Sequence, residues 1–237
     1  MSRRRFIADE IHGNTAALVG EHAAHLARVL RAQVGQEFDI SAAGVVRRGT
    51  ITAISAERAE FALGEEYVIR PVPRLEVALA IFKFDRMEWA IEKCTELGVA
   101  RIVPVIARRT DSHLAAAAVK RTERWRKIAR QASEQSRRVQ VPEVELPLRL
   151  KEFGASTSVS SARIVLAENE QDTTLRHALG AGTGTVTLAI GPEGGWTDEE
   201  LQGFREGGWV TATLGTTILR AETAAIVATA LALDAMR

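Results

Sequence analysis

The sequence predicts an α/β protein in which a parallel sheet is preceded by a small β-rich module. A strand at Val77–Phe82, a helix that Gly98 ends and a strand at Ile102–Ile106 form one strand–helix–strand unit, and such a crossover joins parallel strands. A second unit of strand, glycine-rich bend and helix runs from Val186 to Glu200. Residues 1 to about 70 instead contain short apolar or alternating runs between glycine-bearing turns, a pattern typical of β structure.

The first module combines strands with basic side chains. A short helix is expected over His22–Arg31, and the strands are expected at Arg5–Ile11, Glu37–Ile40, Val45–Ile54 and Ala59–Val68. Basic residues on a small β module indicate contacts with phosphates, which give affinity without reading sequence. For any single arginine, solvated surface charge is the simpler interpretation. The basic residues of this module include Arg3, Arg4, Arg5, Arg28, Arg31, Arg47 and Arg48, and the candidates for RNA contact among them are Arg3, Arg4, Arg5, Arg28 and Arg31.

Pro71-Val72-Pro73 is the best domain boundary, because two prolines around one residue stiffen an extended connector. It predicts domains at residues 1–71 and 72–237. After the boundary, Asp85 is expected to cap a helix, and Cys94 lies on its apolar face, where a core role is expected.

A long helix is expected over Lys120–Arg138. Its basic residues and Trp125 could grip a phosphate backbone, or the helix could pack through Trp125, Ile128 and Ala132 with its charges in solvent. Both interpretations stay open. Further along, Asp172 is expected to cap a short helix after a strand at Ile164–Ala167.

The glycine-rich bend Gly191-Pro192-Glu193-Gly194-Gly195 lies between a buried strand and a helix. Thr197 and Glu200 have the spacing of a capping box at the start of that helix. The bend has neither the Walker spacing nor GxGxxG, and Glu193 would repel a phosphate, so a ligand that is neutral or cationic nearby is expected. The alternative is a tight turn without a ligand.

A second stretch, Thr213–Ala225, leads into a long apolar helix at the carboxyl end of the chain. Arg220 would lie at the start of that helix, where the macrodipole disfavours a cation, so it is expected to face an anionic group. A surface or ion-paired arginine is the alternative. Glu222 lies in the first turn, where the dipole favours a carboxylate in any case.

The two stretches GPEGGWTDEE and LGTTILRAETA carry a resemblance that covers essentially the whole chain. With Glu92–Val99, Glu123–Trp125 and Glu134–Pro142, they resemble the bacterial 16S ribosomal RNA uridine-N3 methyltransferase family of the SPOUT superfamily. The resemblance implies a SPOUT-type parallel sheet with a C-terminal trefoil knot, a PUA-like RNA-binding barrel at the N-terminus and a homodimer. It also implies S-adenosyl-L-methionine as cofactor and, as substrate, a uridine near the 3′ end of 16S rRNA in the small ribosomal subunit.

The reaction that the resemblance implies sets its own demands on the site. Arg220 would stabilise the developing uracil oxyanion, and the proton of uridine N3 would pass to Glu222 or to water. The loops after three strands would hold the cofactor. The residues on these loops are Leu166, Glu168, Gly191, Pro192, Glu193, Gly194, Gly195, Leu214, Gly215, Ile218 and Leu219.

The chain departs from the family pattern at three positions. Thr217 stands where a basic residue is frequent, Ala221 where threonine is frequent, and Arg137 where glycine is common. Two rival functions are an enzyme of the same fold that modifies another RNA site and a non-catalytic RNA-binding assembly factor. The full-length match argues against the first rival, and the intact glycine-rich and arginine motifs argue against the second.

Bulk properties narrow the class of protein. A hydrophobic content of 46% and a charged content of 26% are typical of a soluble globular chain, and no apolar run is long enough for a membrane span. A single cysteine excludes an internal disulfide, as expected for a cytoplasmic protein. The net charge of +1 requires that any nucleic-acid binding come from local patches, and the scattered histidines predict no metal site.

Overall fold

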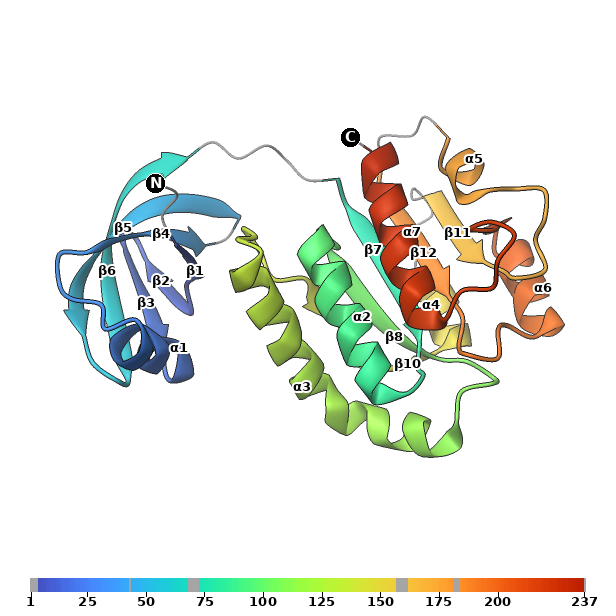
Figure 1. The fold of residues 1–237 in the computed structure, drawn as a ribbon, viewed down its shortest axis with the longest axis horizontal. Helices are drawn as coiled ribbons and strands as arrows, with labels where there is room; N and C mark the ends of the chain where they lie inside the picture. Colours follow the sequence, from blue (N-terminus) through green and yellow to red (C-terminus); the bar gives the residue numbers. More distant parts are fainter. Residues whose placement is uncertain (1–3, 43, 68–72, 157–161, 181–183, 237) are drawn as a thin grey trace. The chain divides into compact units, whose positions relative to one another are not determined.

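The computed structural model describes residues 4–42, 44–67, 73–156, 162–180 and 184–236 (Figure 1). The chain divides into two compact units. The first comprises Met1–Pro71 with Ser133–Gln140, and the second comprises Val72–Ala132 with Val141–Arg237. The predicted connector lies mostly outside the described residues, of which Pro73 is one.

The first unit is a six-stranded mixed sheet with a short helical segment. Its strand order is β1-β4-β5-β6-β3-β2, and β1 pairs with β4 in parallel while the other neighbours are antiparallel. The two edge strands of the sheet, β1 and β2, follow one another directly in the sequence, so the sheet curls and brings its two edges together (Figure 1). The elements are β1 (Arg5–Ile7), β2 (Glu10–His12), β3 (Thr15–Val19), α1 (Glu21–Ala24), the π-helical turn η1 (His25–Val29), β4 (Glu37–Ala42), β5 (Val45–Ile54) and β6 (Arg58–Tyr67).

The apolar side chains inside the curl form a core of their own, which includes Leu18, Leu26 and Phe61. β3 was not predicted, because two of its residues are alanines with little strand preference. Its full register with β6, from Thr15–Ala62 to Val19–Arg58, stabilises it as a strand.

The second unit is a three-layer α/β structure, which confirms the predicted parallel sheet. The seven-stranded sheet has the order β10-β8-β7-β12-β11-β13, with β9 also paired to β8, and every pair is parallel. Its elements are β7 (Leu75–Ala80), α2 (Phe84–Leu97), β8 (Arg101–Ile106), α3 (Ser112–Gln135), β9 (Glu143–Val144), β10 (Leu148–Arg149), α4 (Leu150–Ser156), β11 (Ala162–Leu166), α5 (Leu175–Leu179), β12 (Val186–Ile190), α6 (Asp198–Glu206), β13 (Val210–Ala212) and α7 (Ala221–Ala235).

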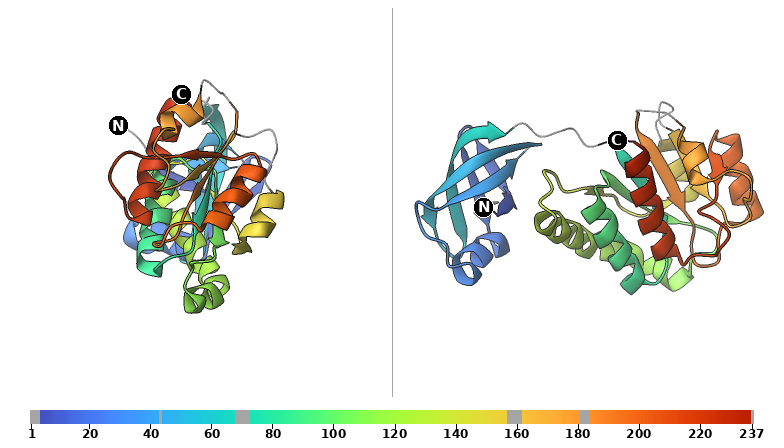
Figure 2. Two further views of the ribbon diagram at one scale, coloured as in Figure 1. Left: turned by 90° about the vertical axis from the view of Figure 1, so that its right-hand side faces the viewer. Right: turned by 45° about the horizontal axis from the view of Figure 1, so that its top comes forward.

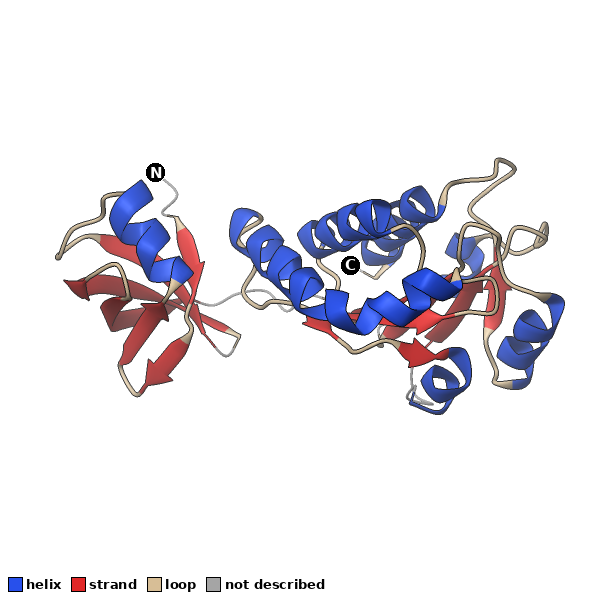
Figure 3. Cartoon of the chain, turned by 90° about the horizontal axis from the view of Figure 1, so that it is seen from below, coloured by secondary structure: helices blue, strands red, loops and turns tan. Residues whose placement is uncertain are grey.

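Helices cover both faces of this sheet (Figure 3). Residues of α2, α3, α5 and α7 share one buried cluster with one face of the strands, and residues of α4 and α6 share a second cluster with the other face. α2 and α7 lie side by side (Figures 1 and 2). Between them Thr229 Oγ1 donates to Cys94 Sγ at 3.4 Å, and Cys94 is buried in the core as predicted.

Two predicted helix caps are wrong. Lys83 is the N-cap of α2, without a side-chain hydrogen bond, and Asp85 lies inside the first turn. Thr174 caps α5, and its hydroxyl accepts from the backbone N of His177. Asp172 lies two residues before this cap, and its backbone N donates to Glu170 Oε1 at 3.0 Å. In both helices the N-cap is the residue at which the backbone leaves the extended conformation, and a nearby aspartate did not identify that residue.

The long basic helix has different limits from those predicted. α3 begins at Ser112, because the run of alanines that follows favours a helix, and it ends at Gln135. Arg137 has φ 57, a left-handed conformation that does not continue a helix.

Candidate functional site

A cavity of about 520 Å³ lies at the carboxyl ends of β11, β12 and β13, where the loops that follow these strands meet. Ligands of open α/β sheets bind at this edge. Every residue that the sequence predicts for the cofactor lines the cavity: Leu166, Glu168, Gly191, Pro192, Glu193, Gly194, Gly195, Leu214, Gly215, Ile218 and Leu219. Thus three loops far apart in the sequence meet at one site.

Trp196 fixes the shape of the glycine-rich loop. Its buried indole donates from Nε1 to the carbonyl of Leu166 at 3.1 Å, so it joins the loop after β12 to the end of β11. A Cβ on Gly191 would lie only 3.2 Å from the same ring, which explains why this position has no side chain. Gly195 has φ 68, a conformation that glycine adopts readily.

The capping box predicted for α6 is confirmed. Thr197 Oγ1 accepts from the backbone N of Glu200 at 3.2 Å, and Glu200 Oε2 accepts from the backbone N of Thr197 at 2.9 Å. The other oxygen of Glu200 accepts from the backbone N of Arg108 at 2.7 Å, so the cap also holds the loop after β8. The start of α6 is therefore fixed on two sides.

Arg109 is a site residue that the sequence reasoning missed. It lines the cavity from the loop after β8, and its Nη1 donates to the carbonyls of Gly194 at 2.5 Å and Trp196 at 3.2 Å. The guanidinium thus holds the backbone of the glycine-rich loop open toward the cavity. Its position just after a strand of a parallel sheet is the signal that could have found it.

Arg86, in the first turns of α2, is a second missed residue on the cavity wall. Its Nη1 lies 2.5 Å from Glu193 Oε1, and its Nε lies 3.8 Å from Glu222 Oε1. Glu193 is half-exposed in the glycine-rich loop, whereas Glu222 is 5% exposed in the first turn of α7 and does not line the cavity. Glu222 Oε2 is buried and has no hydrogen-bond partner among the described residues.

Arg220 is the N-cap of α7, as the sequence predicts, and its exposed side chain lines the cavity. In the described part of the chain, its guanidinium has no hydrogen bond or ion pair. Arg86 and Arg109 are both held by other groups of the protein, so Arg220 is the cavity arginine whose charge stays available to a ligand.

Glu170 shapes the loop after β11. Its carboxylate accepts from the Thr211 hydroxyl at 2.7 Å and from the backbone N of Thr173 and Asp172 at 3.1 and 3.0 Å. These donors lower the pKa of Glu170, the Thr211 hydroxyl most strongly. The loop that carries Glu168 is thereby tied to β13.

The arginines predicted to contact RNA have different surroundings. Arg3 lies outside the described residues, and Arg4, Arg28 and Arg31 are exposed. Arg5 is used within its own unit, since its Nη1 donates to the carbonyl of Arg137 at 2.7 Å. The exposed arginines Arg28 and Arg31, which carry no ion pair to any residue described, keep their charge available to an anion.

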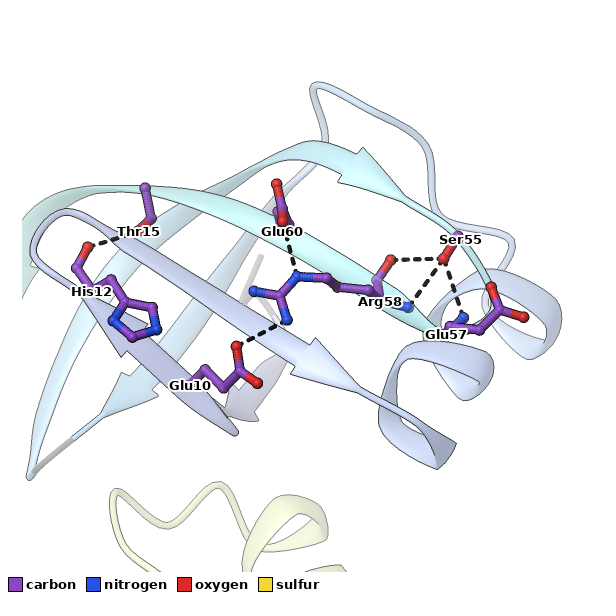
Figure 4. A network of polar contacts seen from close by, with 7 residues as sticks. All are labelled: Glu10, His12, Thr15, Ser55, Glu57, Arg58 and Glu60. Carbon is purple, nitrogen blue, oxygen red and sulfur yellow. Dashed lines mark hydrogen bonds and ion pairs between the residues drawn. The ribbon is translucent and has the colours of Figure 1, made fainter.

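Arg58 lies in a network of polar contacts in the first unit (Figure 4). Its guanidinium donates to Glu10 of β2 at 2.8 Å and to Glu60 of its own strand, β6, at 2.9 Å. The small cavity beside it, about 100 Å³, is also lined by His12. With its charge balanced by two carboxylates, Arg58 is a poor partner for a phosphate.

The basic helix α3 is largely committed to packing and ion pairs. Trp125 is fully buried and meets Phe84 edge to face, and Glu88 of α2 pairs with Arg124 at 2.7 Å and Arg121 at 3.5 Å. Of the two interpretations of this helix, these contacts favour packing.

Two kinds of feature are absent from the described residues. These residues contain no group of three or more histidine, cysteine, aspartate or glutamate side chains arranged to hold a metal ion. None of their helices has the length and apolarity that a membrane crossing requires.

The chain is similar to known RNA methyltransferases. The profile of the family described as RNA methyltransferase domain matches residues 70–233. The ribosomal RNA small subunit methyltransferase E of Bacillus subtilis is 31% identical, over 90% of this chain and 88% of its own length.

Two solved structures have the same fold along almost the whole chain. The ribosomal RNA small subunit methyltransferase E of Neisseria gonorrhoeae, bound to S-adenosyl methionine, has a TM-score of 0.84 at 28% identity and covers 96% of this chain and 95% of its own. A Legionella pneumophila protein described as a methyltransferase, in complex with the same cofactor, has a TM-score of 0.86 at 28% identity and covers 99% and 98%.

Proposed function

The chain belongs to the family of RNA methyltransferase domains, and we propose that it methylates N3 of a uridine near the 3′ end of 16S rRNA with S-adenosyl-L-methionine. The relatives named ribosomal RNA small subunit methyltransferase E support the small-subunit RNA as substrate. The observation that carries the proposal is the meeting of all predicted cofactor residues in one cavity, with the uncommitted cation of Arg220 on its wall.

The cavity suits the cofactor in size and chemistry. Its volume of about 520 Å³ lies in the usual range of ligand pockets, and the glycine-rich loop and residues 214–219 supply much of its lining. The cofactor supplies an electrophilic methyl group on a positively charged sulfur. Carboxylates are compatible with that charge, and the cavity has Glu168 on one wall and Glu193, paired to Arg86, on another.

The chemistry assigns roles to the chain's own residues. Uridine N3 carries a proton at neutral pH, and negative charge develops on the uracil oxygens as that proton leaves. Arg220 stabilises this charge, and it acts from the amino end of α7, where the helix dipole adds to the effect. Glu222 is buried behind Arg86 and away from the cavity lining, so water is the better of the two proton acceptors considered, and Glu222 acts through Arg86.

The proposed function also assigns a role to each of the two domains. We assign residues 1–71 to a PUA-like RNA-binding barrel, in which Arg3, Arg4, Arg5, Arg28 and Arg31 serve the RNA, and residues 72–237 to a SPOUT domain with a trefoil knot around the cavity. The curled six-stranded sheet and the exposed Arg28 and Arg31 support the first assignment. The fold shared with S-adenosyl methionine-bound relatives supports the second.

We also propose that the protein is a cytoplasmic homodimer. α7 is apolar on nearly all sides, and Leu231 on it and Trp89 on the adjacent α2 are about half exposed, at 47% and 48%. These two exposed apolar side chains on neighbouring helices support a subunit contact at this part of the surface. Light scattering after size-exclusion chromatography tests the subunit number.

Methyl transfer from labelled cofactor to small ribosomal subunits, free 16S rRNA and tRNA tests the function, with nucleoside analysis of the product. The expected result is label in 3-methyluridine from the subunit. Arg220→Ala should lower kcat by about 10²–10³ while the protein still binds the cofactor, because one transition-state contact is lost. Arg205→Ala, an exposed arginine on α6 outside the cavity lining, is the matched control. Label in another nucleoside or only in tRNA would refute the proposed target, and an active Arg220→Ala variant would refute the role of Arg220.

A further inference from the structure

Arg86 connects two segments that the sequence keeps far apart. Its guanidinium pairs with Glu193 of the glycine-rich loop and faces Glu222 at the start of α7, and it lies itself at the start of α2. Nη1 donates a hydrogen bond to Glu193, and Nε lies at ion-pair distance from Glu222, so one guanidinium interacts with both carboxylates through different atoms.

Each end of this link carries a part of the site. Glu193 is flanked by Pro192 and Gly194 in the loop predicted to hold the cofactor, and all three line the cavity. Glu222 lies two residues after Arg220, within the same first turn of α7. The position of Arg220 therefore depends on how that turn is held against α2.

The burial of Glu222 makes the link more than an incidental surface pair. Its side chain is 6% exposed, and Oε2 has no hydrogen-bond partner among the described residues, so the carboxylate depends on Arg86 for compensation of its charge. Lys93 provides a contrast on the same helix. It also pairs with two carboxylates, Glu92 and Glu96, but both belong to α2, so Lys93 joins no second segment.

We propose that Arg86 is a positioning residue for the methyl transfer, which fastens the cofactor loop to the turn that carries Arg220. This inference rests on the proposed function for its catalytic consequence, but its structural part, the coupling of residue 86 to the cofactor loop, does not. Arg86 acts on the reaction through Glu193 and Glu222.

The test compares Arg86→Ala, Arg86→Lys, Glu193→Gln, the double variant Arg86→Ala/Glu193→Gln and the control Lys93→Ala. Two quantities are measured: the Kd of S-adenosyl-L-methionine by calorimetry without RNA, and kcat on small ribosomal subunits at saturating cofactor. Arg86→Ala should raise Kd severalfold and lower kcat by about tenfold or more, because the loop and the Arg220 turn are both released. The double variant should raise Kd no further than Arg86→Ala alone, since both changes break the same pair.

Arg86→Lys distinguishes a positioning role of Arg86 from a general contribution to the stability of the fold. Lysine keeps one positive charge but has no fork, so it should restore most of the Kd and only part of kcat. Lys93→Ala should match the wild type in both quantities. If Arg86→Ala does not fold, Arg86→Lys and Glu193→Gln carry the same comparison.

Three results would overturn the inference: wild-type Kd and kcat in Arg86→Ala, independent effects of the changes at 86 and 193 on Kd, or Arg86→Lys as defective as Arg86→Ala in both quantities. A wild-type protein that binds the cofactor but methylates no RNA would instead refute the proposed function. In that case the coupling of Kd between Arg86 and Glu193 still decides the structural part of this inference.

Discussion

Replacing Trp196 by phenylalanine should weaken both the fold of the second unit and the binding of the cofactor. The indole of Trp196 is buried at 7% exposure, packs edge to face with Phe204 at 5.0 Å between ring centroids, and donates to the Leu166 carbonyl. Phenylalanine keeps an aromatic ring at this place but has no N–H. The change therefore removes the tie between the glycine-rich loop and β11 with little other disturbance.

The expected cost follows from these two losses. A hydrogen bond whose remaining partner stays buried is worth about 1–3 kcal/mol, and the smaller ring gives up packing comparable with one methylene group, ~1 kcal/mol. The two losses together come to about 3 kcal/mol, which corresponds to a fall in Tm of roughly 6–12 °C for a domain of this size. Because Gly191 and Leu166 both line the cavity, we expect the Kd of the cofactor to rise about tenfold, which is 1.4 kcal/mol.

Trp209→Phe is the matched control, measured by the same thermal melts and cofactor calorimetry. Trp209 is 5% exposed in the same buried cluster and packs on Phe204 at 5.0 Å, but its indole makes no hydrogen bond to any residue that the structure describes, and it does not line the cavity. This variant should lose about 1 kcal/mol of packing and keep the wild-type Kd. If Trp196→Phe and Trp209→Phe melt together and bind the cofactor equally, the indole hydrogen bond does not organise the site.

Three further predictions concern charge. The hydrogen-bond donors around Glu170 lower its pKa below 4.5. The stability that the charged carboxylate adds to the folded protein is therefore complete above the ordinary carboxyl pKa and is lost as the pH falls through the lowered value. Glu170→Gln should melt at a lower temperature than the wild type at pH 7, and this difference should disappear in acid. Burial raises the pKa of Cys94 from 9.0 to about 11, so at pH 8 the native thiol should react with a maleimide at least about a hundredfold more slowly than in denaturant. Arg28→Ala/Arg31→Ala should weaken binding to small subunits at low salt and reduce the slope of log K against log salt by about one to two, and an unchanged slope would exclude both from the RNA interface.

Local signals in the sequence predicted the parts of the fold that depend on neighbouring residues. The run Val186–Ile190 is a strand with those bounds, and the Thr197–Glu200 capping box forms because its two members lie within one turn. Arg220 could be assigned to the start of α7 for the same reason, since the apolar run after it sets the helix.

The residues that sequence reasoning missed act over long separations. Arg86 and Glu193 are 107 positions apart, and Arg109 and Gly194 are 85 apart, so neither pair leaves a periodic or spaced signal. The weaker signal is topological, because Arg86 and Arg109 follow the carboxyl ends of β7 and β8, neighbours in a parallel sheet. That rule could have named the two loops, but the side chain within each loop that reaches the cavity depends on tertiary packing.

One departure from the family pattern, Arg137, has a direct conformational cost. Arg137 stands where glycine is common, and its φ of 57 is a conformation in which a residue with a Cβ is held at a cost of about 1 kcal/mol. The carbonyl of Arg137 accepts from Arg5 Nη1 in this conformation, and the contact offsets part of the cost.

Thr217 is exposed on the cavity wall where a basic residue is frequent in the family. Among the described residues that line the cavity, the positive charge comes from three arginines on different segments, and the glycine-rich loop holds two of them in place. A cation at 217 would lie close in sequence to Arg220 and could supply part of the positive charge that is proposed to stabilise the uracil oxyanion. In the proposed mechanism, the absence of a cation at 217 leaves transition-state stabilisation to Arg220 and the control of its position to Arg86. Thr217→Arg should therefore partly restore kcat in Arg220→Ala if charge at this wall, rather than one geometry, limits the reaction.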